Sequence, residues 1–167
     1  MNVTIASRQR ARKINRRLLK QITTALLADL KIEKADLGIH LVAAPEMTRL
    51  NEKFLRHAGP TDVITFDYGF GVPPSGGFPP DYSRRTSRLK PELQTLHGEI
   101  FVCAGEAVLQ ARKFGTSWQS EVVRYIVHGV LHLLGFNDSS AGARSKMKRE
   151  ENRRLRELSR RFPLSKL

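Results

Sequence analysis

Two histidines four residues apart are the side chains of this sequence best suited to chemistry. They are His128 and His132, and the chain continues to Gly135 and Asp138. Residues at i and i+4 of an α-helix lie on one face, so both imidazoles can converge on one ion. Gly135 can end that helix in a left-handed turn, which lets the chain fold back and bring Asp138 to the same ion. The spacing predicts a three-ligand site for one metal ion, expected to be zinc, with an open position for water.

The alternative is that both histidines are core residues whose ring nitrogens bond to backbone carbonyls. The stretch 121–134 around them is apolar on nearly every side and predicts a buried helix. Burying two unpaired imidazoles there would be costly, and a shared metal removes that cost. An open coordination position is typical of catalytic sites. We therefore expect the chemistry to come from a metal-bound water held by His128, His132 and Asp138.

The same histidine spacing occurs in zinc proteases, where a glutamate directly after the first histidine acts as general base. This chain has Gly129 at that position, and glycine cannot move a proton. A zinc-bound water would remain, but the base would not. A metalloprotease is therefore the least favoured of the hypotheses.

The composition is strongly basic, with 29 Lys and Arg against 16 Asp and Glu and a formal net charge of +13. Such a charge favours a polyanionic partner, and nucleic acid is favoured over an anionic membrane. The alternative is a solvated surface that is basic without binding a polyanion. The single cysteine excludes an intrachain disulfide and fits a reducing compartment. No signal peptide or bilayer-spanning segment is recognisable, so we expect a cytoplasmic protein without membrane contact.

Hydrophobic spacing predicts one α+β domain over residues 1–167, with a small mixed β-sheet covered by helices and the histidine helix buried in the core. The predicted order is strand, helix, strand, helix, strand, strand, helix, helix, helix, over residues 3–5, 8–30, 36–44, 46–56, 61–66, 98–103, 104–114, 121–134 and 143–162. The basic faces of the first and last helices either contact RNA phosphates or are simply solvated.

Residues 69–95 are rich in proline, glycine and arginine, which predicts a mobile loop insertion rather than a domain linker. Phe70, Phe78 and Tyr82 lie beside its cations and could stack bases. A surface insertion without that role is the favoured interpretation.

Motifs from most of the chain occur in a characteristic order. They are Leu50–Asn51 with Phe54, Pro60–Phe66, Gly98–Val102, the histidine motif, and Met147 with Glu150. Together they resemble the YbeY family of bacterial rRNA-maturation endoribonucleases. The resemblance implies a single-domain α+β protein that holds one zinc ion and cleaves single-stranded RNA. It also implies a role in 3′-end maturation of 16S rRNA and in ribosome quality control, with a small-subunit ribosomal protein and an assembly GTPase as partners.

Carried onto this chain, the family's metal ligands are His128, His132 and Asp138. Most members have a third histidine where this chain has Asp138. Aspartate is also a zinc ligand, and its negative charge should reduce the Lewis acidity of the metal.

The family's arginine position falls on Leu55, and Arg56 is its neighbour, about 100° further around a helix. We take Arg56 as the candidate catalytic residue that would bind phosphate and stabilise developing charge. The carboxylates Asp62 and Glu99 lie in the family-like segments, where we expect capping and strand-end roles. The leading hypothesis is metal-assisted cleavage of RNA, and the alternative is a non-catalytic RNA- or ribosome-binding assembly factor with a structural metal.

Overall fold

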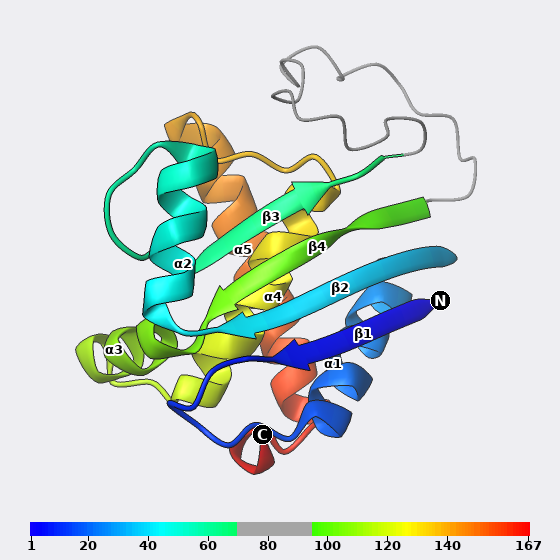
Figure 1. Cartoon of the computed structure of the whole chain (residues 1–167). Helices are drawn as coiled ribbons and strands as arrows, with labels where there is room; N and C mark the ends of the chain where they lie inside the picture. Colours follow the sequence, from blue (N-terminus) through cyan, green and yellow to red (C-terminus); the bar gives the residue numbers. More distant parts are fainter. Residues whose placement is uncertain (70–94) are drawn as a thin grey trace.

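Four strands form one mixed sheet in the order β1-β2-β4-β3 (Figure 1). The computed structural model describes residues 1–69 and 95–167, so the loop expected over 69–95 lies outside the described residues except at its two ends. The strands β1 (Asn2–Ser7), β2 (Lys34–Val42) and β4 (Thr95–Cys103) run parallel, and β3 (Val63–Asp67) pairs antiparallel with β4 at the edge. The predicted α+β class and mixed sheet are confirmed.

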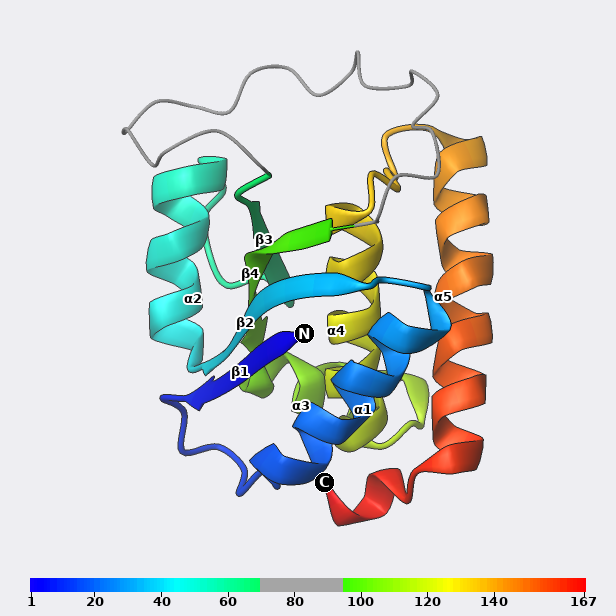
Figure 2. The same cartoon turned by 90° about the vertical axis from the view of Figure 1, so that its right-hand side faces the viewer.

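Helices cover the two faces of this sheet unequally (Figure 2). One side carries α1 (Arg16–Asp29), α4 (Trp118–Leu133) and α5 (Ala141–Arg161), and the other carries α2 (Ala44–Leu50). The helix α3 (Ala104–Phe114) packs against α4, and a 3-10 turn (Leu164–Lys166) follows α5. In the described part of the chain, no helix has the length and apolar character needed to cross a membrane.

The helix α4 lies between the sheet and α5, and it is the centre of the main core. Its residues Val122, Ile126 and Val130 are fully or almost fully buried, as are Ile39 and Ile100 of the sheet. Burial on both sides explains why this stretch is apolar nearly all round. The buried histidine-bearing helix expected from the sequence is therefore present.

At Gly129, α4 lies directly against two strands of the sheet. A Cβ atom added there would lie 2.9 Å from Ile100 Cγ2 and 3.1 Å from Thr65 Cγ2. Both contacts are tighter than normal packing allows, and the two neighbours belong to different strands. The position that carries the general base in zinc proteases therefore has no room for a side chain in this protein.

Gly129→Ala should consequently destabilise the fold by about 1–3 kcal/mol through overpacking, and the gain in helix propensity should offset only part of this loss. Urea unfolding followed by circular dichroism measures the change. The matched control is Gly142→Ala in the first turn of α5, where an added Cβ meets nothing within 4 Å. A Gly129→Ala protein as stable as wild type would show that α4 is not held this closely.

Two predicted helices differ from the structure. The helix predicted over 8–30 begins only at Arg16, because Asn15 caps it by accepting a hydrogen bond from the Leu18 amide. The helix predicted over 46–56 begins earlier, and after Leu50 it widens into a π-helical turn, Asn51–Leu55. Arg56 ends that turn with a left-handed backbone, φ 58°.

Candidate metal centre

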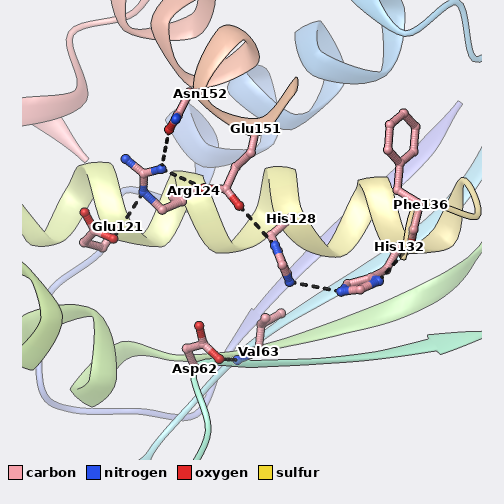
Figure 3. Close-up of polar contacts among 9 residues, drawn as sticks. All are labelled: Asp62, Val63, Glu121, Arg124, His128, His132, Phe136, Glu151 and Asn152. Atoms are coloured by element: carbon pink, nitrogen blue, oxygen red, sulfur yellow. Dashed lines mark hydrogen bonds and ion pairs between the residues drawn. The ribbon is translucent and has the colours of Figure 1, made fainter. Parts of the chain in front are cut away.

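The two histidines lie on adjacent turns of α4 and point toward one another. Ser117 begins this helix by accepting a hydrogen bond from the Ser120 amide. Because the ring positions are one turn apart, His128 Nε2 and His132 Nε2 approach to 3.0 Å (Figure 3). Both side chains are half-buried against the sheet.

The chain reverses directly after the second histidine. Gly135 adopts φ 85°, and the amides of Gly135 and Phe136 donate to the carbonyls of His132 and Leu131. This is the Schellman arrangement, which closes a helix with a left-handed glycine. The reversal brings Asp138 back to the histidines, so that one potential ligand atom from each of the three residues lies within 4.8 Å of the others. The structure therefore assembles the three residues named from the sequence.

Acceptors behind the two rings fix which ring nitrogens carry the protons. His132 Nδ1 lies 3.0 Å from the carbonyl oxygen of Phe136, which can only accept a hydrogen bond. His128 Nδ1 lies 3.0 Å from Glu151 Oε2 on α5 (Figure 3). These contacts assign each Nδ1 as a donor, so a ring in its neutral form presents the lone pair of its Nε2 toward the other ring.

Two lone pairs 3.0 Å apart repel each other unless a cation or a proton lies between them. Burial and the nearby His128 lower the pKa of His132, which disfavours the proton. A metal ion would accept both lone pairs, and Asp138 would add a carboxylate oxygen. Two imidazoles and one carboxylate suit zinc and related first-row metals, so the residues fit the predicted ion. Simple core histidines would not need this arrangement.

Glu151 is the residue of this centre that the sequence analysis missed. Its carboxylate receives hydrogen bonds from His128 and from Arg124, whose Nη1 lies 2.6 Å from Glu151 Oε1. Burial alone would raise the pKa of Glu151, but the bonds from His128 and Arg124 outweigh it and hold the pKa below the usual range. A carboxylate behind a ligating histidine orients the ring and increases its basicity.

A sequence signal for Glu151 did exist. The buried side of α5 consists of Met147, Glu151, Leu155 and Leu158, so a single acid interrupts an otherwise apolar stripe. A buried carboxylate needs a partner, and such a position points inward to one. The resemblance had directed attention to Glu150, which instead pairs with Arg154.

Arg56 and Asp62 are not part of the group formed by His128, His132 and Asp138. Arg56 is exposed at the end of the π-helical turn that continues α2, the helix on the opposite face of the sheet from α4. Asp62 accepts hydrogen bonds from the Val63 amide and from Thr61, which confirms the expected capping role.

The strand-end role expected for Glu99 is wrong, because this residue lies within β4. Its carboxylate accepts a hydrogen bond from the Tyr68 hydroxyl at 2.6 Å and lies 2.9 Å from His40 Nε2. Burial opposes ionisation of Glu99, yet the bonds from Tyr68 and His40 lower its pKa, while burial and Glu99 raise the pKa of Tyr68 to about 12. This cluster buttresses the sheet beside Phe101, which stacks on His40.

Fold and site together define a class of small α+β proteins that could hold a metal ion on a central two-histidine helix. A family model described as endoribonuclease YbeY matches residues 2–159, and the chain belongs to this family. A relative named endoribonuclease YbeY from Elusimicrobium minutum is 32% identical, over 81% of this chain and 83% of the relative. The one from Aquifex aeolicus is 28% identical, over 93% and 86%. A Thermotoga maritima protein of known solution structure shares the fold at TM-score 0.58 and 21% identity, over 93% of this chain and 88% of its own.

Proposed function

We propose that the protein is a zinc-dependent endoribonuclease that cleaves single-stranded RNA. The observation that carries the proposal is the pair of Nε2 lone pairs directed at one point, with the Asp138 carboxylate within 4.8 Å. Membership of the endoribonuclease YbeY family supports RNA as the substrate. When bound, the metal supplies Lewis acidity at the scissile phosphate and lowers the pKa of a coordinated water.

The protein's own residues hold this centre ready for the ion. Glu151 and the Phe136 carbonyl keep His128 and His132 in the tautomers that present Nε2. Asp138 is exposed, so the centre opens to solvent, and to a polymeric substrate, on that side. Arg144 donates to the Asp138 carbonyl at 2.9 Å and braces the loop that carries this ligand. Arg56, exposed at the end of the π-helical turn, is proposed to bind a substrate phosphate.

The finer biological role rests on the family resemblance. We propose that the RNA is 16S rRNA, cut during 3′-end maturation and in ribosome quality control in the cytoplasm. A small-subunit ribosomal protein and an assembly GTPase are the proposed protein partners. Comparing the 3′ ends of 16S rRNA in cells with and without the protein tests this role, and identical ends would contradict it.

Asp138 variants test the third ligand. Asp138→Ala should lower metal affinity by at least about tenfold, because changing a residue that only hydrogen-bonds to a metal ligand already costs about 10–100-fold. Asp138→His should keep one ion per chain, because the imidazole supplies a ligand nitrogen at the same position. Metal content after dialysis, measured by inductively coupled plasma mass spectrometry, separates the two variants. Full metal occupancy in Asp138→Ala would show that this carboxylate is not a ligand.

An assembly factor with a structural metal is the second candidate, and the net charge of +13 favours it as much as it favours a nuclease. The metal-loaded protein would then bind ribosomal RNA tightly without cutting it. A cleavage assay on labelled single-stranded RNA, run with and without chelator, decides between the two functions.

A further inference from the structure

The outer face of α5 carries a continuous stripe of cations. Arg144, Lys148, Arg149, Arg153 and Arg156 line an open groove of about 700 Å³ together with Ser145 and Asn152. Every one of these residues is exposed. At about 100° per residue, Arg149, Arg153 and Arg156 lie on the side of the helix away from the buried stripe that contains Glu151, and Arg144 and Lys148 join them in lining the groove.

The acids of α5 neutralise only one of these five cations. Glu151 is turned inward to His128 and Arg124, and Arg153 pairs with Glu150 and Glu157. Within the residues that the structure describes, the side chains of Lys148, Arg149 and Arg156 form neither a hydrogen bond nor an ion pair, and the backbone carbonyl of Arg156 accepts from Ser159. Like charges on neighbouring turns destabilise a helix, so the cluster has no apparent benefit for the isolated fold.

The stripe begins at the metal centre. Arg144, its first member, donates to the backbone carbonyl of the ligand residue Asp138. From there to Arg160 the helix advances by about 24 Å, at 1.5 Å per residue. An extended polyanion that enters the centre beside Asp138 could therefore continue along α5.

We propose that this outer face, Arg144 to Arg160, is a track that binds the phosphates of the RNA segment next to the cleavage site. The proposal rests on the proposed endoribonuclease function and names a second contact surface for its substrate. Recognition is by charge and not by base, because Ser145, Asn152 and Ser159 stand between the cations and no aromatic side chain does. The large apolar residues of α5 are on its buried side, so this face has none to insert into a membrane surface.

The test removes three unpaired cations in the variant Lys148→Gln/Arg149→Gln/Arg156→Gln. The matched control, Lys34→Gln/Arg112→Gln/Lys113→Gln, loses the same charge from exposed positions outside α5. Metal-loaded proteins are titrated into a fluorescent single-stranded 2′-O-methyl RNA of about 20 nucleotides, which ribonucleases cut slowly. Anisotropy gives Kd at salt concentrations from about 50 to 200 mM.

Each phosphate contact to a single strand contributes about −0.7 to the log–log salt slope, so losing three contacts should flatten the slope by about 2. Over this fourfold salt range, wild type should lose about 18-fold more affinity than the α5 variant does. The control variant should retain the wild-type slope. The proposal would be overturned if the α5 variant kept the wild-type salt slope and Kd. It would also be overturned if the control variant lost as much RNA affinity as the α5 variant.

Binding and cleavage are read separately, so the two proposals fail differently. If wild type fails to cut RNA but the α5 variant shows the predicted loss of binding, the track stands and the nuclease function falls. If wild type cuts RNA and the α5 variant binds it equally well, only the track falls. Tighter binding of polyglutamate than of RNA by wild type would overturn RNA as the occupant in favour of an acidic protein.

Discussion

His132→Ala is expected to abolish RNA cleavage by the purified protein and to remove its metal. In the proposed centre this imidazole is one of two nitrogen ligands, and the remaining His128 and Asp138 would bind an ion weakly. We expect the rate of RNA cleavage to fall by more than about 100-fold, since changing residues that only hydrogen-bond to metal ligands already costs about 10–100-fold. Cleavage of a labelled single-stranded RNA and metal content measured on the same preparation test both effects.

The matched control for this variant is His97→Ala. His97 lies on β4 with about half of its side chain exposed, and its neighbours are Asp36 and Tyr68. Its loss should leave both cleavage and metal content at the wild-type level. Undiminished cleavage by His132→Ala would identify a contaminating nuclease and contradict the proposed mechanism.

Glu151→Gln should weaken metal binding by about 10–100-fold without displacing any ligand. The amide keeps the shape of the carboxylate but loses the charge that makes His128 more basic. Its NH₂ group can also donate to Nδ1, which would move the His128 proton to Nε2, where the metal should bind. Competition with a chromophoric zinc chelator measures the affinity.

Glu150→Gln provides the comparison, because the same chemical change falls one residue away on α5 and affects only the ion pairs with Arg153 and Arg154. Its metal affinity should match that of wild type. Equal affinities for Glu151→Gln and wild type would show that Glu151 serves only to anchor Arg124. Circular dichroism of both variants separates such an effect from general loss of structure.

The features that could be predicted from the sequence depend on local geometry. The facing of His128 and His132 follows from helical periodicity, and the reversal at Gly135 follows from the conformational freedom of glycine. Both features depend only on residues within a few positions of one another in the sequence. The order of strands and helices also follows from hydrophobic spacing, because that spacing reflects which faces are buried.

The features that escaped prediction depend on contacts between distant segments. Glu151 is 23 residues from the histidine that it orients, and only the packing of α5 against α4 brings them together. The late start of α1 depends partly on Gln9, whose buried side chain bonds to the backbone of Arg12 and competes with helix formation. The π-helical turn before Arg56 likewise has no periodic signal in the sequence.

The bond between His128 and Glu151 has a thermodynamic consequence for α5. A ligand that binds only the folded state stabilises that state by mass action. In the proposed centre, His128 is hydrogen-bonded to the Glu151 carboxylate of α5, so metal binding depends on the position of this helix. Metal loading should therefore protect the α4–α5 contact against local unfolding. Because this coupling is reciprocal, a change that opens the α4–α5 contact should weaken metal binding by up to the coupling free energy. The cationic stripe is on the same helix but faces away from Glu151. RNA bound to the stripe would therefore be linked energetically, through α5, to an ion that it does not touch.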